Sequence, residues 1–273
     1  MVTNLIATYC LCADSLLALR HTEDSQVHMT DAEILTTALF SARFFRGNLQ
    51  ATRGYLKSHG FIPRMLSLSR FLRRLYRIQH LLVLLVRALG KHFSQLNTSS
   101  TYLLDSFPIQ ACDNIRIKRN KVLGEEKYRG YCASKKRYFY GVKIVLLCTA
   151  QGEPVEVFLI PGSVHDVSAL RILDFDLPQG SEVYCDSAFT EYETEDLLGE
   201  ALGIRVKPMR KKNSKRKEEP WMGYIQAVMR KRIETVGSSV ERFLPKSIHA
   251  VTAQGFFLKV FLFVAATSLD ALF

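Results

Sequence analysis

The sequence predicts a mixed α/β fold in which a sheet with flanking helices follows a mostly helical N-terminal region. Three observations support this prediction. Residues 1–98 show mainly helical spacing of apolar residues. Residues 101–160 contain runs of β-branched and aromatic residues separated by turn signals. Residues 161–243 alternate short apolar runs with helical patterns, which is typical of a sheet covered by helices.

Length and composition are those of an ordinary globular protein. The chain has 273 residues, of which 48% are hydrophobic and 23% are charged. These values exclude wholesale disorder, collagen-like repeats and a polytopic membrane protein. The length suits one large domain or two domains of ordinary size. Because the polar segment 97–101 separates two kinds of periodicity, we expect a helical region at 1–98 and a second domain at 99–273.

Three helices are expected in the N-terminal region. Thr30 or Asp31 is placed to cap a helix that continues through Phe40. A second helical run covers residues 66–75. The third, at 78–89, is almost wholly apolar, which predicts burial on several of its faces.

The second domain is expected to begin with three strands. A short buried strand covers 101–105, and a basic, turn-rich excursion occupies 113–137. Strands at 138–149 and 155–160 form a hairpin around the turn at 151–154. The next elements are a helix capped by Asp166 or Ser168 and reaching Leu173, a strand at Glu182–Cys185, a helix at 191–202, a strand at 204–208 and a helix at about 224–243. An antiparallel meander followed by alternating strands and helices is the ribonuclease-H-like arrangement.

The C-terminal stretch 255–273 is the most membrane-like part of the chain. It is long enough to span a bilayer, but Lys259 and Asp270 interrupt it, and charges inside a bilayer are costly. We therefore favour a helix packed in a protein core, and we expect no membrane association. At the other end, no Lys or Arg precedes the apolar residues in 1–13, so we expect no signal peptide.

Six cysteines in 273 residues are too sparse for a disulfide scaffold. No C-x-x-C pair occurs, so a structural zinc site has no support. Reduced, buried thiols and a cytoplasmic location are expected.

Three acids stand out by their positions. Asp105 and Asp186 end the apolar runs that are expected to form the first and fourth strands, and Glu234 lies in the last helix of the sheet domain. The first and fourth strands are neighbours in a ribonuclease-H-like sheet, so both aspartates can meet at one edge, with the helix bringing Glu234 over them. Each acid has an ordinary alternative, which is a turn or cap for the aspartates and a salt bridge within the helix for Glu234.

Grouped carboxylates repel one another unless cations neutralise them. Mg²⁺ prefers oxygen ligands, usually one or two protein carboxylates together with phosphate oxygens. Two such ions about 3.5–4 Å apart can activate the attacking oxygen and stabilise the leaving oxygen of a phosphoryl displacement. The three acids therefore predict a site for two Mg²⁺ ions, with Mn²⁺ as a substitute, at which phosphodiesters are cleaved or joined.

The cations outnumber the acids by 37 to 26, which gives a formal net charge of +11. This excess favours a polyanionic partner, either a nucleic acid or an anionic membrane surface. The cations cluster at 116–143, 205–217 and 230–232. An isolated cluster is usually a solvated face, but these three bracket the acids. We expect phosphate contacts from Lys143, His165, Lys207, Arg210, Lys211, Lys212, Arg230, Lys231 and Arg232. His165 and Asp166 can equally form a helix cap, and both interpretations stay open.

Five segments together resemble the DDE transposases of bacterial insertion sequences. They are LLDSFP at 103–108, YGVK at 140–143, PGSVHD at 161–166, CDSAF at 185–189 and RIET at 232–235. The resemblance is to the insertion-sequence-982 family in particular, and it extends to 31–34 and 66–75 in the N-terminal half. The chain has Val145, Cys185 and Phe189 where that family has His, Gly and Tyr.

The resemblance implies a ribonuclease-H-like catalytic domain that performs metal-dependent cleavage and strand transfer at terminal inverted repeats. Asp105, Asp186 and Glu234 match the family's first, second and third acids. Glu241, in a Val-Glu-Arg pattern, is a rival for the third acid. Glu234 is preferred because Arg230 precedes it in an Arg-x-x-x-Glu spacing.

The implied partner is double-stranded DNA, as the terminal inverted repeats and as the target. A homodimer or a higher oligomer is expected on this DNA, in a bacterial cytoplasm near the nucleoid. The helical region 1–98 is a candidate for binding the DNA ends, with 66–76 in the major groove or, alternatively, packed in the core. Two other functions stay open: a catalytically decayed, repressor-like DNA-binding protein, and a ribonuclease-H-like nuclease acting on other nucleic acids.

Overall fold

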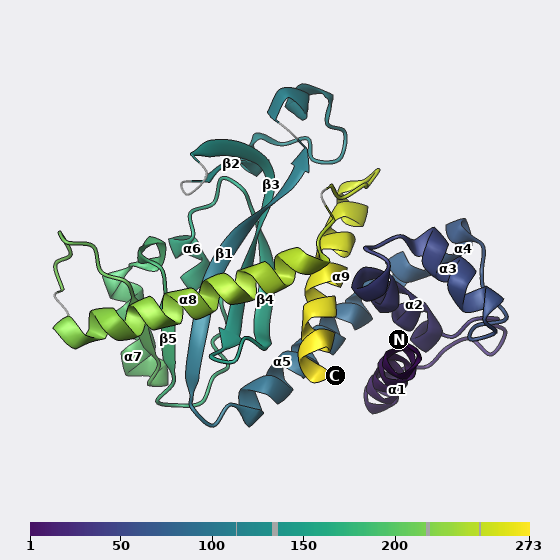
Figure 1. Cartoon of the computed structure of the whole chain (residues 1–273), viewed down its shortest axis with the longest axis horizontal. Coiled ribbons are helices and arrows are strands. Elements are labelled where there is room, and N and C mark those ends of the chain that lie inside the picture. The colour runs from purple at the N-terminus through teal and green to yellow at the C-terminus, as the bar shows by residue number, and fades with distance from the viewer. Residues whose placement is uncertain (113, 133–135, 217–218, 246) are drawn as a thin grey trace. The chain divides into compact units, whose positions relative to one another are not determined.

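A computed structural model describes residues 1–112, 114–132, 136–216, 219–245 and 247–273. The chain divides by its internal contacts into two compact units. The helical unit contains Met1–Leu89, Val240–Ile248 and Gln254–Phe273, and the sheet unit contains Gly90–Ser239 and His249–Ala253. Figure 1 shows both along the colour gradient of the chain.

The helical unit is built from amphipathic and apolar helices. Its elements are α1 (Val2–Ala18), α2 (Asp31–Phe44), α3 (Leu49–Ser58), α4 (Leu68–Arg77), most of α5 (Gln79–Leu96) and most of α9 (Ala253–Leu272). Thr30 caps α2: its Oγ1 accepts a hydrogen bond from the Glu33 amide at 3.1 Å, and its own amide donates to Glu33 Oε2 at 2.7 Å. This reciprocal capping box decides between the two expected caps in favour of Thr30.

Helix α9 is the one helix of the described residues that is long and apolar enough to cross a membrane. However, 67% of its apolar window is buried within the protein. Gly47 lies against it so closely that an added Cβ would approach the Phe263 ring to 2.8 Å. The apolar side chains of α9 therefore form part of the core of the helical unit, as expected for a packed helix.

The sheet unit contains a mixed sheet of six strands among the described residues. The central strand β1 (Thr101–Cys112) pairs antiparallel with β3 (Arg137–Thr149) and parallel with β5 (Glu182–Cys185). Both β2 (Arg129–Cys132) and β4 (Pro154–Pro161) pair with β3, and β6 (Arg205–Pro208) extends the sheet beyond β5. This order confirms the predicted ribonuclease-H-like fold class.

The two faces of this sheet are covered differently. One face carries Tyr102, Leu104, Val145, Leu147 and Val183 in a core shared with Ala169, Leu170 and Leu198 of α6 (Val167–Leu170) and α7 (Tyr192–Leu202). Alternation places Asp105 and Phe107 on the opposite face. A Cβ added at Gly237 of α8 (Pro220–Phe243) would lie 3.8 Å from the Phe107 ring, so α8 covers the face that carries Asp105 (Figure 1).

Some element boundaries differ from the sequence predictions. The first strand continues to Cys112 instead of ending at 105, because β3 pairs with it along its whole length. Strand β2 lies in what was expected to be an irregular basic excursion, together with the 3₁₀ helices Asn114–Arg119 and Glu126–Tyr128. Helix α6 ends at Leu170, three residues before the expected end.

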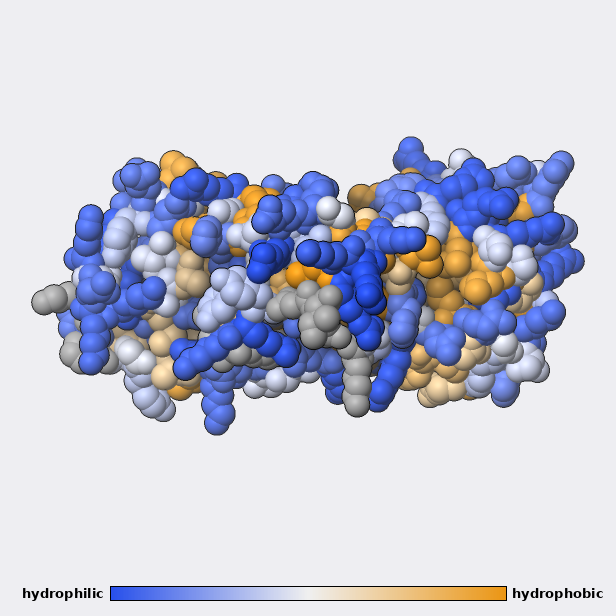
Figure 2. Space-filling view, turned by 90° about the horizontal axis from the view of Figure 1, so that it is seen from above, coloured by the Kyte–Doolittle hydropathy of each residue, from blue (hydrophilic) through white to orange (hydrophobic). Residues whose placement is uncertain are grey.

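The surface in Figure 2 is mostly hydrophilic over the sheet unit, whereas a larger hydrophobic area lies over the helical unit. All six cysteines are free thiols, of which Cys12, Cys148 and Cys185 are buried.

Candidate active site

Asp105 and Asp186 come from neighbouring parallel strands. Leu104 of β1 stands opposite Cys185 of β5, and each aspartate is the next residue along its chain. Both Leu104 and Cys185 are buried in the sheet core, so the two aspartates follow at the point where the parallel pairing ends. Strand β1 continues beyond Asp105 to Cys112, whereas its pairing with β5 ends at Leu104, one residue before Asp105.

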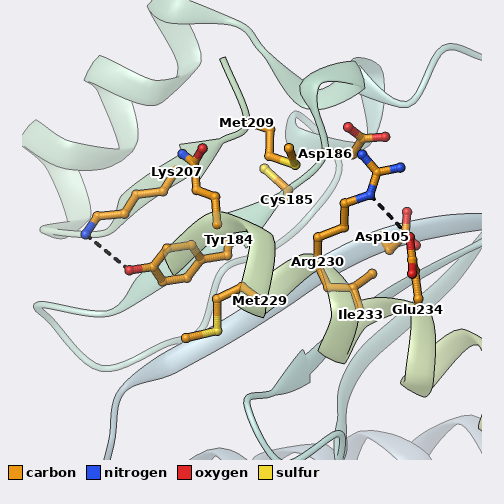
Figure 3. A pocket seen from close by; sticks show the side chains of 11 residues that line it. Asp105, Tyr184, Cys185, Asp186, Lys207, Met209, Met229, Arg230, Ile233 and Glu234 are labelled. Atoms are coloured by element: carbon orange, nitrogen blue, oxygen red, sulfur yellow. Dashed lines mark hydrogen bonds and ion pairs between the residues drawn. The ribbon is translucent and has the colours of Figure 1, made fainter. Parts of the chain in front are cut away.

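Helix α8 brings Glu234 to the same pocket. The pocket is lined by the three predicted acids and by Tyr184, Cys185, Lys207, Met209, Gln226, Met229, Arg230 and Ile233. Ile233 is buried against the sheet unit, whereas 66% of the Glu234 side chain is exposed. Figure 3 shows Arg230, Ile233 and Glu234 projecting from α8 toward the ends of the strands. Three acids that are far apart in the sequence thus line one pocket.

The surroundings of Asp105 shift the pKa of its carboxyl group. Burial, with the nearby charges of Asp186 and Asp166, raises its pKa from 3.8 to about 7. The Ser106 amide, which donates to Asp105 Oδ1 at 2.7 Å, and the Arg230 charge oppose this rise in pKa. A carboxyl group with a pKa near 7 gains by binding a cation, because a bound cation favours its ionised form.

Arg230 already interacts with this acidic group. Its Nε lies 3.2 Å from Glu234 Oε1, one helical turn away, and its charge also acts on Asp105. In Figure 3 its guanidinium points toward Asp186. Arg230 therefore competes with any other cation for the same carboxylates.

A second polar group, formed by Ser106, Asp166 and Lys143, adjoins Asp105 in the chain. Asp166 Oδ1 accepts hydrogen bonds from Ser106 Oγ at 2.7 Å and from Lys143 Nζ at 2.9 Å. Lys143 also donates to the Val164 carbonyl at 2.8 Å. Asp166 makes no capping hydrogen bond with its side chain at the start of α6. The side chain of Asp166 thus acts as an ion-pair partner for Lys143 and supports the residue next to Asp105.

The donor set fits hard divalent cations, since Asp105, Asp186 and Glu234 offer only carboxylate oxygens. These oxygens are not all within 4.8 Å of one another; among the described residues that criterion is met by His21, Glu23 and Asp31 in the helical unit. Arg74 forms ion pairs with both of those acids, so that group already has a cationic partner. At the pocket, Glu234 would have to turn from Arg230 to share a cation with the aspartates.

The predicted phosphate contacts fall into two groups. Lys143, Lys207 and Arg210 are paired, with Asp166, Glu182 and Glu195 respectively, at 2.9, 2.8 and 2.5 Å. The side chains of the second group are exposed. They are His165, Lys211, Lys212, Arg230, Lys231 and Arg232.

The rival third acid lies elsewhere. Glu241 is two helical turns beyond Glu234 on α8, in the segment Val240–Ile248 that groups with the helical unit. It does not line the pocket. The positions at which the chain departs from the resembled family are core positions, because Val145, Cys185 and Phe189 are at most 3% exposed.

Sequence reasoning missed the supporting residues. The sequence predicts a helix cap at Asp166 and includes it in the segment PGSVHD, but it gives no sign of a pairing with Lys143, and no pattern singles out Ser106 or Glu195. Ser106 binds Asp166, 60 residues away, and Glu195 binds Arg210, 15 residues away. Contacts over such separations cannot be predicted from a local sequence pattern. The one available signal was the acid Asp166 directly after the exposed His165 at a strand-to-helix connection.

Comparison with known proteins is consistent with this geometry. A family model described as a transposase DDE domain matches residues 96–246, more than half of the 273 residues. No curated protein and no solved structure matches the chain. All three acids of the pocket lie inside the matched segment.

Proposed function

The chain belongs to the DDE transposase family, and we propose that it cleaves DNA and transfers strands at the terminal inverted repeats of an insertion sequence. The observation that supports this proposal best is the pocket in which Asp105 and Asp186, from adjoining parallel strands, lie with Glu234 of α8. The finer assignment, to the insertion-sequence-982 family, is supported by the five sequence segments described above.

In this proposal Asp105, Asp186 and Glu234 hold two divalent ions, Mg²⁺ or Mn²⁺. When bound, such ions activate the attacking oxygen and stabilise the leaving oxygen of a phosphodiester. The residues of the chain prepare the site. Asp105 must lose its proton, and Glu234 must leave Arg230, before all three carboxylates can share cations.

DNA binding is assigned to exposed cations near the pocket and to the helical region 1–98. Arg230 lines the pocket, and Lys231 and Arg232 follow it on α8. A net charge of +11 supports a polyanionic partner. We propose that region 1–98 reads the terminal repeats, and that two or more copies act together on DNA in the bacterial cytoplasm.

A cleavage assay tests the proposal. Purified protein is incubated with Mg²⁺ or Mn²⁺ and an end-labelled duplex that carries the element's terminal repeat. Wild type is compared with Asp186→Asn and with Asp176→Asn, which changes an exposed aspartate outside the pocket. We expect metal-dependent nicking at the repeat boundary by wild type and Asp176→Asn, and none by Asp186→Asn.

The other outcomes point to other functions. Repeat binding without cleavage by any of the three proteins would indicate a decayed, repressor-like copy. Cleavage that is independent of the repeat sequence would indicate a nuclease of broader substrate range.

A further inference from the structure

The loop 209–216 joins β6 to the segment before α8, and it belongs to the most basic stretch of the chain. Residues 205–217 contain eight Lys and Arg and no acid. The loop begins at Met209, which lines the acidic pocket, and the Met209 amide donates to the Cys185 carbonyl at 3.0 Å. Its first residue is therefore fixed directly beside Asp186.

Two arginines of the loop form ion pairs with acids of α7. Arg210 forms a two-pronged ion pair with Glu195 of α7, with N···O distances of 3.0 and 2.5 Å. Arg216 forms a second two-pronged pair with Asp196, at 2.8 and 2.6 Å. Glu195 is only 4% exposed in its side chain and Arg210 12%, so this pair is fixed and largely desolvated.

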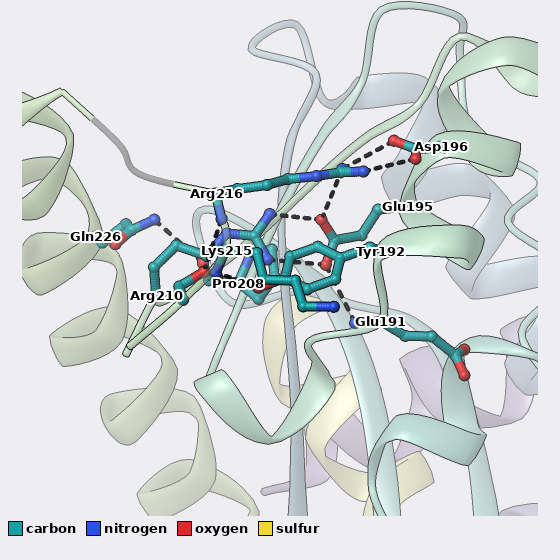
Figure 4. Close-up of polar contacts among 10 residues, drawn as sticks. Glu191, Tyr192, Glu195, Asp196, Pro208, Arg210, Lys215, Arg216 and Gln226 are labelled. Carbon is teal, nitrogen blue, oxygen red and sulfur yellow. Dashed lines mark hydrogen bonds and ion pairs between the residues drawn. The ribbon is translucent and has the colours of Figure 1, made fainter. Parts of the chain in front are cut away.

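Tyr192 joins the two ends of the loop. The guanidinium carbons of Arg210 and Arg216 lie 5.3 and 4.8 Å from the centre of its ring. Its hydroxyl is 2.8 Å from Ser214 Oγ and accepts a hydrogen bond from the Lys215 amide at 3.1 Å. Figure 4 shows this network, with Arg210, Lys215 and Arg216 gathered around the start of α7.

Arg216 is exposed but is paired with Asp196. The other exposed cations of the loop 209–216 are Lys211, Lys212 and Lys215. Within the described part of the chain, none of the three forms an ion pair. The anchored arginines hold the backbone in place, so three positive charges are presented with little freedom left to the loop. Such preorganised cations lose less entropy on binding a polyanion than cations on a free loop would.

We propose that Lys211, Lys212 and Lys215 bind backbone phosphates of duplex DNA next to the acidic pocket, and that Arg210 and Arg216 are positioning residues that hold the loop. This assignment rests on the proposed function and refines it. It removes Arg210 from the residues that touch DNA and adds Lys215.

Salt dependence of DNA binding tests the assignment. The affinity of the full-length protein for a labelled duplex is measured between 50 and 200 mM salt in EDTA, so that no cleavage occurs. Lys211→Ala/Lys212→Ala is compared with Arg171→Ala/Arg205→Ala, a control that removes two exposed cations paired with Glu191 and Glu182. Each lost phosphate contact lowers the slope of log K against log salt by about 0.9. We expect a decrease of about 1.8 for the lysine variant and less than about 0.5 for the control.

A second variant separates contact from positioning. Glu195→Leu/Arg210→Met replaces the buried pair without changing the net charge. If Arg210 only holds the loop, the slope stays at the wild-type value; a decrease of about 0.9 would place Arg210 on the DNA and overturn the division of roles. Circular dichroism and thermal unfolding confirm that the variant is folded before it is used.

The results also distinguish the two proposals. Wild-type binding with equal slopes for the lysine variant and its control would overturn the loop assignment alone. Absence of duplex binding by wild type would overturn both the loop assignment and the proposed function. Loss of repeat cleavage in Asp186→Asn, together with a slope that falls by about 1.8 in the lysine variant but not in its control, supports both.

Discussion

Arg230 combines two properties that oppose each other at the pocket. It donates to Glu234, and its charge acts on Asp105, so it neutralises part of the acidic group. For the same reason it competes with a divalent cation. Arg230→Gln should therefore bind Mn²⁺ several-fold more tightly than wild type in the absence of DNA, as measured by electron paramagnetic resonance of free Mn²⁺. Lys231→Gln, which removes an exposed charge from outside the pocket, serves as the control. Equal affinity in the two variants would contradict the competition.

The raised pKa of Asp105 has a consequence for stability. Burial, then Asp186 and Asp166, raise this pKa from 3.8 to about 7. Between these two pH values the folded protein holds a proton that the unfolded chain has released, so the free energy of unfolding falls as the pH rises from about 4 to about 7. Asp105→Asn should lose this dependence.

Thermal unfolding at pH 5 and pH 8 in EDTA measures the difference. We expect wild type to lose on the order of 2 kcal/mol more than Asp105→Asn over this interval, since partial exposure screens the full effect. Asp176→Asn, at an exposed position, should follow the wild-type curve. A wild type that gains stability toward pH 8 relative to Asp105→Asn would show that the sign is wrong.

The three acids could be found from the sequence because each follows or lies on a strongly patterned element. Asp105 and Asp186 end apolar runs whose strand order follows from the predicted fold. The pairing of Lys143 with Asp166 and of Arg210 with Glu195 could not be found in this way. An exposed lysine and a paired one have the same sequence signature, because partner choice depends on tertiary contacts.

Within the sheet unit, Gly90 of α5 lies very close to the backbone of β4. A Cβ at Gly90 would lie 1.8 Å from the Val155 carbonyl oxygen of β4, which is far inside van der Waals contact. Gly90→Ala should lower the free energy of unfolding by about 2–3 kcal/mol or more, because backbone on both sides would have to move. Gly54 of α3 has nothing within 4 Å of an added Cβ, so Gly54→Ala should instead raise it by about 0.5–1 kcal/mol. Urea unfolding of the two variants should give changes of opposite sign.

The capping box of α2 is expected to stabilise the start of that helix. Thr30→Ala removes an acceptor for the Glu33 amide and should cost about 1 kcal/mol. Ser67 occupies the same position at the start of α4 but makes no side-chain capping bond. Ser67→Ala should therefore change the free energy of unfolding by less than about 0.5 kcal/mol. Equal losses in the two variants would mean that the hydrogen bond at Thr30 contributes little.

Elements with strong periodicity were predicted close to their observed limits, and elements without it were not. β3 and α7 start within one residue of the expected positions and end where expected. Strand β2 could not be predicted because Arg129–Cys132 has no apolar alternation. Gly130 is required there by tertiary packing, since an added Cβ would clash with Phe139 and the Gly162 carbonyl. The extension of β1 through Pro108 was missed because proline usually argues against an inner strand.

Each compact unit combines segments from distant parts of the chain. The helical unit contains both ends, Met1–Leu89 and Gln254–Phe273. The sequence boundary expected near residue 98 came from a local change in periodicity, which carries no information about such long-range association. The overall charge of +11 likewise predicts a polyanionic partner but not which of the cations meets it.

Helix α9 is apolar enough either to pack in a protein core or to span a bilayer, and the two alternatives predict different behaviour without detergent. Its apolar residues are buried in the helical unit, and Val264 is 0% exposed. Val264→Asp should therefore lower the melting temperature of detergent-free protein by about 10 °C or more, because an unpaired charge in a core costs several kcal/mol. Gln254→Asp introduces the same charge at an exposed position of the same helix and should change it by less than about 2 °C. A helix that spans a bilayer would instead leave the wild-type protein in the membrane fraction, with no folded form recovered without detergent.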